Sequence, residues 1–146
     1  MKFFMMIGIP GSGKSTKALE LAKIYNAEVF SSDEIGLELH GQYGPNGKEV
    51  FDEMNKRIEE ALKNEKNIIF DATNTKAFSR IKNLELANTY KCEKIAVWIK
   101  TDYKKCFERN KQRDRKVPEV VISRFMKDFE EPILEEGFDK ILIIEN

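Results

Sequence analysis

The sequence predicts an α/β fold in which a doubly wound, mainly parallel β-sheet is flanked by helices. Strand-like apolar runs alternate with helix-like segments along the whole chain, which is typical of this fold class. A glycine-rich segment, Gly8–Ser15, directly follows the first apolar run, where a strand would turn into a helix. With 146 residues, 41% of them hydrophobic and 34% charged, the chain is expected to form a single globular domain over residues 1–146.

The first half of the chain opens with the apolar run Lys2–Ile7, which predicts a buried strand, and continues with a predicted helix over Gly13–Tyr25. Glu28–Phe30 is expected to form a short strand. Apolar residues along one stripe predict an amphipathic helix over Lys48–Lys63. Helix-breaking residues predict that Gly36–Gly47 forms a loop before that helix; they are Gly41, Gly44, Pro45 and Gly47.

The second half repeats the alternation of strand and helix. One apolar strand ends at Asp71, and Pro118 opens a later helix at the position where its missing N–H costs least. The predicted strands are Asn67–Phe70, Glu93–Ile99 and Ile141–Ile144, and the predicted helices are Ser79–Thr89, Thr101–Lys111 and Pro118–Phe129.

Residues 8–15 have the spacing G-x-x-x-x-G-K-S that is typical of a phosphate-binding loop (P-loop). Glycines allow successive backbone N–H groups to turn inward around phosphate oxygens. Lys14 supplies a charge for the β- and γ-phosphates, the Ser15 hydroxyl can ligate Mg²⁺, and the next helix presents the positive end of its dipole. The sequence therefore predicts that ATP or another nucleoside triphosphate binds with Mg²⁺, through Gly8, Pro10, Gly11, Ser12, Gly13, Lys14, Ser15 and Thr16.

Polar residues also follow the second predicted strand, and ligands gather at the carboxyl ends of parallel strands. Asp33 is the candidate general base, which would take the proton of a hydroxyl that attacks the γ-phosphate. Glu34 is a substitute for this role. The alternative is that Ser31, Ser32 or Asp33 only caps a helix that starts at Glu34.

A second polar group follows the third strand. Asp71 is expected to hold Mg²⁺ or its water shell, with capping of the next turn as the alternative. Thr73 and Asn74 are candidate contacts to the acceptor or braces for Asp71. Arg80 is a candidate substrate contact, with an arginine on a helix surface as the alternative. The P-loop, Ser31–Asp33 and Asp71–Asn74 are expected to converge on one crevice.

Residues 101–117 contain seven basic and three acidic side chains. Arg109 and Arg113 are four residues apart, so on a helix they would share one face. Such a pair can close over the triphosphate as a helical arginine lid and offset charge in the transition state. Arg115 and Lys116 are reserves for this role. The alternative is a solvated basic helix end that complements the helix dipole.

The composition argues against several other classes of protein. The net charge is zero, from 25 basic and 25 acidic residues, which disfavours binding to nucleic acid by bulk electrostatics alone. Cys92, Cys106 and His40 lack metal-ligand spacing, so no zinc site is expected and the thiols are expected to be reduced. No apolar run approaches the ~20 residues of a membrane span. We therefore expect a cytoplasmic protein that makes no contact with a membrane.

The set of motifs resembles the polynucleotide 5′-kinase family of P-loop kinases, whose phage and bacterial members phosphorylate 5′-hydroxyl ends. The matching stretches are GIPGSGKST from Gly8, SSDEI from Ser31, IFDATN from Ile69 and RNKQRDRKVPEVVISRFMKDF from Arg109. The resemblance implies that Lys14 and Ser15 hold the triphosphate and Mg²⁺, and that Asp33 is the general base. It also implies that Arg109 and Arg113 are lid arginines, and that the substrate is the 5′-hydroxyl end of RNA or DNA, as in nucleic acid repair.

One position departs from this family. Members that act on nucleic acid often have an arginine three residues beyond the catalytic aspartate, where it contacts a substrate phosphate, and here that residue is Gly36. A kinase of the same fold that acts on a small molecule or a nucleoside hydroxyl is therefore the nearest alternative. A nucleotide-binding switch without an acceptor is a third interpretation, and Asp33 and the paired arginines argue against it.

Overall fold

The computed structural model describes residues 1–114 and 116–146, so the expectation for Arg115 lies outside the described residues. A five-stranded sheet in the order β2-β3-β1-β4-β5 forms its centre, and every pair of neighbouring strands is parallel. The strands are β1 (Lys2–Ile7), β2 (Glu28–Ser31), β3 (Ile68–Asp71), β4 (Glu93–Lys100) and β5 (Lys140–Glu145). The predicted parallel sheet is confirmed.

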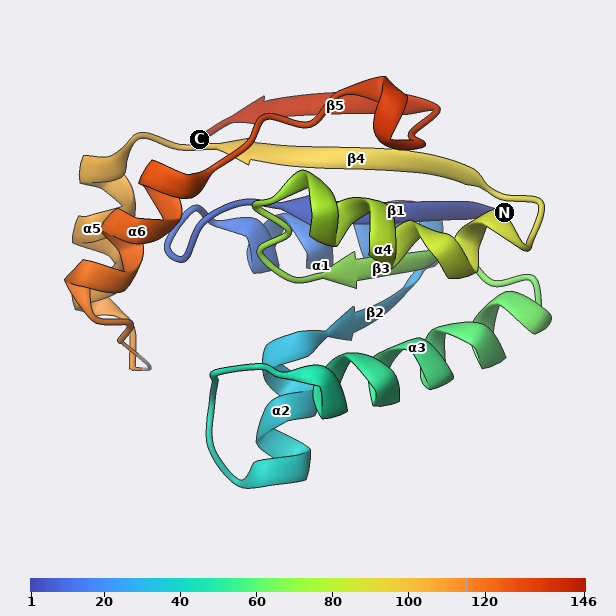
Figure 1. The fold of residues 1–146 in the computed structure, drawn as a ribbon, viewed down its shortest axis with the longest axis horizontal. Coiled ribbons are helices and arrows are strands. Elements are labelled where there is room, and N and C mark those ends of the chain that lie inside the picture. The colour runs from blue at the N-terminus through green and yellow to red at the C-terminus, as the bar shows by residue number, and fades with distance from the viewer. Residues whose placement is uncertain (115) are drawn as a thin grey trace.

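Helices cover both faces of the sheet, with α1 behind it and α4 in front in Figure 1. β1 is buried on both sides: Phe4 and Met6 belong to the core beneath α1, and Phe3, Met5 and Ile7 to the core beneath α3 and α4. This is the doubly wound arrangement that the sequence predicts. The helices are α1 (Lys14–Tyr25), α2 (Ser32–His40), α3 (Lys48–Lys63), α4 (Ala77–Asn88), α5 (Tyr103–Gln112), α6 (Glu119–Asp128) and the short 3₁₀ helix η1 (Leu134–Glu136).

The carboxyl ends of three strands meet at one edge of the sheet. In the strand register Asp71 of β3 lies opposite Met6 of β1 and opposite Ser31 of β2. Helices α5 and α6 lie beyond this edge, where the strand arrows point in Figure 1. The fold therefore places the P-loop, the start of α2 and the end of β3 next to one another.

The predicted loop over Gly36–Gly47 is wrong in its first part, because residues 36–40 belong to α2. Glycine is a poor helix former, but α2 packs on the core through Ile35, and this packing outweighs the low propensity of a single residue. Asn46 packs so closely on the helix that a Cβ at Gly36 would lie 2.6 Å from Asn46 Oδ1. The helix ends at Gly41, which has a left-handed φ of 71°.

Smaller differences concern the ends of elements. Pro118 is the N-cap of α6 and not its first helical residue, and η1 had no counterpart among the predicted elements. Within residues 1–114 and 116–146, no helix combines the length and the apolar character needed to cross a membrane.

Candidate nucleotide-binding and active site

The P-loop follows β1, and glycines set its shape. Gly11 and Gly13 have φ values of 84° and 93°, in the left-handed region that other residues rarely adopt. Gly11 also packs directly on the backbone carbonyl of Cys106 in α5, which leaves no room for a Cβ. Gly8 donates its N–H to the carbonyl of Thr73 at 3.0 Å. The loop is thus held between the β3–α4 connection and α5.

The carbonyl of Ser12 accepts hydrogen bonds from three side chains that are distant in the sequence. The donors are Thr101 Oγ1 at 3.0 Å, Arg109 Nη1 at 3.2 Å and Asn146 Nδ2 at 2.9 Å. They come from the residue after β4, from α5 and from the residue after β5. The P-loop backbone is therefore tied to the second half of the chain.

Lys14, Ser15 and Asp71 form one polar cluster at the end of β3. Lys14 Nζ lies 3.1 Å from Asp71 Oδ1, and Ser15 Oγ donates to Asp71 Oδ2 at 3.1 Å. The side chain of Asp71 is only 4% exposed, so its charge depends on Lys14 for compensation. The Asp71 carboxylate is thus directed at the P-loop.

Asp33 lies in the first turn of α2, and Ser31 is the residue that caps this helix. Ser31 Oγ accepts the backbone N–H of Glu34 at 3.3 Å. Of the three residues expected as possible caps, Ser31 takes this role and Asp33 does not, and the helix starts at Ser32 instead of Glu34. Asp33 Oδ1 instead accepts a hydrogen bond from Asn46 Nδ2 at 2.8 Å. Because Ser31 pairs in register with Asp71, Asp33 starts from the same sheet edge as the Lys14 cluster.

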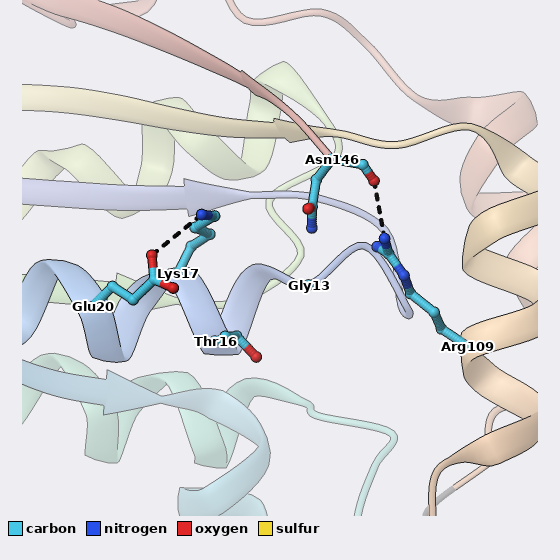
Figure 2. A pocket seen from close by; sticks show the side chains of 6 residues that line it. All are labelled: Gly13, Thr16, Lys17, Glu20, Arg109 and Asn146. Atoms are coloured by element: carbon cyan, nitrogen blue, oxygen red, sulfur yellow. Dashed lines mark hydrogen bonds and ion pairs between the residues drawn. The ribbon is translucent and has the colours of Figure 1, made fainter.

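A pocket of about 320 Å³ lies beside the start of α1, between α1, α5 and the residue after β5 (Figure 2). On its α5 side, Arg109 Nη2 donates to the carbonyl of Asn146 at 3.1 Å. On its α1 side, Lys17 Nζ pairs with Glu20 at 3.2 Å. Its size lies at the lower end of the range for small-molecule sites, about 300–1,000 Å³. The lining residues are Gly13, Thr16, Lys17, Glu20, Arg109 and Asn146.

The prediction that Arg109 and Arg113 share one helix face is wrong. Helix α5 ends at Gln112, and Arg113 has an extended backbone with φ −92° and ψ 152°. The side chain of Asn110 stabilises this exit from the helix, since it accepts the N–H of Val117 at 2.8 Å and donates to the carbonyl of the same residue. Arg109 therefore contacts the P-loop from the helix, and Arg113 belongs to the connection towards α6.

The structure buries Arg80 and Asn74, which corrects the expectation that Arg80 contacts substrate and gives Asn74 a bracing role among its two expected ones. The Arg80 side chain is 0% exposed, and it pairs with Glu136 at 2.6 and 2.9 Å. Its Nη1 donates to the carbonyl of Asn74 at 2.9 Å, and the Asn74 amide donates to the carbonyl of Met6 at 2.8 Å. Arg80 is thus neither a substrate contact nor a surface arginine. Both residues brace the β3–α4 connection, in which Thr73 is half-buried.

Three residues that contact the site were missed by the sequence analysis: Asn46, Thr101 and Asn146. Asn46 belongs to no motif, and nothing in a single sequence distinguishes it from other asparagines. Thr101 and Asn146 directly follow β4 and β5, and their places at the carboxyl ends of strands were the one available signal.

Both cysteines are free thiols. Burial raises the pKa of Cys106, which lies behind Gly11, to about 11, and burial also raises the pKa of the half-buried Cys92. Both thiols are therefore protonated at neutral pH.

The residues of the site fit a magnesium-bound triphosphate. Ser15 and Asp71 offer hard oxygen ligands, and Mg²⁺ at nucleotide sites usually takes one or two protein ligands beside phosphate oxygens and water. Within the described parts of the chain, no group of three or more His, Cys, Asp or Glu residues could hold a metal by itself.

A parallel sheet whose central strand leads into a G-x-x-x-x-G-K-S loop and a helix defines a P-loop nucleotide-binding domain. The comparison with known families agrees with this class. The chain belongs to the AAA domain family, whose model matches residues 3–132.

The chain is also similar to known kinases. It is 26% identical over 133 residues to L-seryl-tRNA(Sec) kinase of Methanococcus maripaludis, a match covering 88% of this chain and 52% of that protein. It is 28% identical over 118 residues to shikimate kinase of Mannheimia succiniciproducens, covering 77% of this chain and 65% of that protein. A chain in the structure of the Pnkp1/Rnl/Hen1 RNA repair complex shares the fold, with a TM-score of 0.73 and 22% identity. The match covers 87% of this chain and 43% of that chain.

Proposed function

We propose that this chain is an ATP- and Mg²⁺-dependent kinase that transfers the γ-phosphate to a hydroxyl group, specifically to the 5′-hydroxyl end of RNA or DNA. The observation that carries the proposal is the position of Asp33. It lies in the first turn of α2, which starts at the same edge of the sheet as the cluster of Lys14, Ser15 and Asp71. A nucleotide switch needs no carboxylate at that position, whereas a hydroxyl acceptor needs a group that takes its proton.

The acceptor class is supported by three likenesses. The motifs resemble those of polynucleotide 5′-kinases, one relative is named for a tRNA, and one structural neighbour is part of an RNA repair complex. Because the chain spans 52% and 65% of the two curated relatives, the rest of their sequences can carry contacts that this domain lacks.

Binding of the triphosphate would use the P-loop backbone and the charge of Lys14. The pocket beside Gly13 would take the nucleoside, next to Arg109 and Asn146. Ser15 and Asp71 would hold Mg²⁺, which supplies neutralisation of phosphate charge when bound. Arg109 and Arg113 would add positive charge from the α5 side as transfer proceeds.

In the transfer step the acceptor hydroxyl oxygen attacks the γ-phosphorus. A new O–P bond forms, the bond from the γ-phosphorus to the β–γ bridging oxygen breaks, and ADP leaves with that electron pair. The carboxylate of Asp33 takes the proton of the hydroxyl. The charge of the leaving ADP remains beside Lys14 and the P-loop N–H groups.

The test is incubation with γ-labelled ATP, Mg²⁺ and a panel of 5′-hydroxyl oligonucleotides, nucleosides and small alcohols. We expect labelled oligonucleotides. Asp33→Asn should lower transfer on the order of 10²–10⁴-fold while ATP still binds, and Lys14→Ala should weaken both binding and turnover. Asp52→Asn, on the exposed side of α3, is the matched control and should behave as the wild type. ATP binding without any labelled acceptor would contradict the kinase proposal.

A second acceptor class is favoured by a specific observation. Gly36 stands where nucleic-acid kinases often have an arginine, and the space beside it is filled by the neutral amide of Asn46. Similarity to shikimate kinase points the same way. Label on a small alcohol or nucleoside, and on none of the oligonucleotides, would select this alternative.

A further inference from the structure

Asn46 lies in the connection between α2 and α3, and its side chain folds onto the first turn of α2. Its Nδ2 donates to Asp33 Oδ1 at 2.8 Å and lies 3.3 Å from Ser32 Oγ. A primary amide has two N–H donors, so both contacts can be made at once. The connection between the two helices is therefore bonded directly to the carboxylate at the start of α2.

The other end of this amide is enclosed. Asn46 Oδ1 is buried and has no hydrogen-bond partner among residues 1–114 and 116–146. A buried carbonyl without a donor is unfavourable, so the contacts of Nδ2 must hold the amide in this place. The position of the side chain is thus set by Asp33 and Ser32.

Gly36 makes this position possible. A Cβ on Gly36 would lie 2.6 Å from Asn46 Oδ1, whereas its next contact would be an ordinary 3.7 Å to Val50 Cγ2. The amide is the far end of a side chain and can move, so a methyl group here would displace it without disturbing the helix. Gly36 and Asn46 therefore form one unit, in which the missing side chain of one residue admits the amide of the other.

We propose that Asn46 is a positioning residue for Asp33, and that Gly36 serves to admit it. This inference rests on the proposed function, in which Asp33 takes the proton of the acceptor hydroxyl. An aspartate at a helix start can adopt several rotamers, and a hydrogen bond from an amide to one carboxylate oxygen restricts them. Since a base works only within hydrogen-bond reach of its proton, a misplaced Asp33 lowers the rate of transfer.

The test is a set of three variants, Asn46→Ala, Gly36→Ala and the double variant, assayed with the acceptor that the wild type phosphorylates. Each single change should lower kcat on the order of tenfold to a hundredfold, the range expected for a lost hydrogen bond to a charged group. The KM for ATP should stay unchanged, because neither residue contacts the P-loop cluster. The double variant should be no slower than either single variant. Gly47→Ala is the matched control, since a Cβ there meets nothing within 4 Å.

Comparing the double variant with the single variants separates a positioning role from a general structural effect. If Gly36→Ala acts through Asn46, adding it to Asn46→Ala costs no further activity, and the extra alanine raises the melting temperature because α2 gains helix propensity. Wild-type kcat in Gly36→Ala, or multiplied losses in the double variant, would overturn the proposal. So would a further loss when Asn46→Ala is added to Asp33→Asn.

An NMR measurement that does not depend on kinase activity tests this inference separately from the proposed function. In ¹H–¹⁵N spectra the side-chain NH₂ signal of Asn46, identified by its loss in Asn46→Ala, should shift in Asp33→Asn and in Gly36→Ala, but not in Gly47→Ala. If no acceptor is phosphorylated, the proposed function fails while these shifts still report the contact between Asn46 and Asp33. If the Asn46 signal shifts in neither Asp33→Asn nor Gly36→Ala, the positioning role is overturned, even if the protein is an active kinase.

Discussion

Replacing Glu136 by alanine should destabilise the fold strongly, because the change leaves the Arg80 guanidinium charged and buried. The two side chains are 0% and 5% exposed and meet through contacts of 2.6 and 2.9 Å. Breaking a buried pair by removing one partner costs about 3–5 kcal/mol. A domain of this size loses about 2–4 °C of melting temperature per kcal/mol. The midpoint should therefore fall by roughly 6–20 °C.

Thermal unfolding followed by circular dichroism at 222 nm measures this shift, and urea unfolding measures the free energy independently. Glu38→Ala is the matched control, because it removes the partner of Arg57 from a pair that is 37% and 58% exposed. Surface pairs contribute little, so that variant should melt close to the wild type. Equal melting temperatures for the two variants would refute the assignment of Arg80 as a buried charge that depends on Glu136.

A double replacement distinguishes the unpaired charge from lost packing. Arg80→Met with Glu136→Leu removes both charges and keeps most of the volume, so it should recover much of the stability that Glu136→Ala loses. If the double variant is as unstable as the single one, the loss comes from packing or from the bond to Asn74 and not from the buried charge.

Two further predictions concern the P-loop and the helix behind it. Gly11→Ala should abolish nucleotide binding in calorimetric titration, since Gly11 has a φ of 84° and packs on the Cys106 carbonyl, and a variant that binds like Gly47→Ala would contradict this. Burial raises the pKa of Cys106 from 9.0 to about 11, so its stabilising effect is complete below pH 9 and is lost as the pH rises towards 11. Urea unfolding between pH 8 and 10.5 should thus show a decline in stability that Cys106→Ala reduces, and equal slopes would exclude this origin.

The sequence predicted those parts of the site that are encoded locally. The P-loop could be identified because its glycines, Lys14 and Ser15 are adjacent in the chain, and the order of strands and helices places Asp71 opposite it. Arg109 was identified by its charge, but its contact with the Ser12 carbonyl depends on how α5 packs.

Other features depend on packing between distant segments, which no local pattern reports. Gly36 was assigned to the loop because of the glycines and the proline that follow it in residues 41–47, while its place inside α2 depends on the packing of that helix, through Ile35, on the core that includes Val50 and Met54. Arg80 appeared to be a surface or substrate arginine because its partner, Glu136, lies 56 residues away. The end of α5 at Gln112 depends on bonds between Asn110 and Val117, which separate Arg113 from the helix.

The two ends of the site are built in different ways, and this bears on how acceptor choice can change. The nucleotide end is held through backbone groups, since the Ser12 carbonyl, the Gly8 N–H and the Gly11–Cys106 contact all involve the main chain. The end that the proposed function assigns to the acceptor includes a contact between side chains of α2 and the connection that follows it, the bond between Asn46 and Asp33. Substitutions in residues 41–46 can therefore alter the surroundings of Asp33 without disturbing the P-loop. We expect acceptor preference to change with this segment and nucleotide affinity to stay constant, so that a variant of residues 41–46 with impaired ATP binding would contradict the separation.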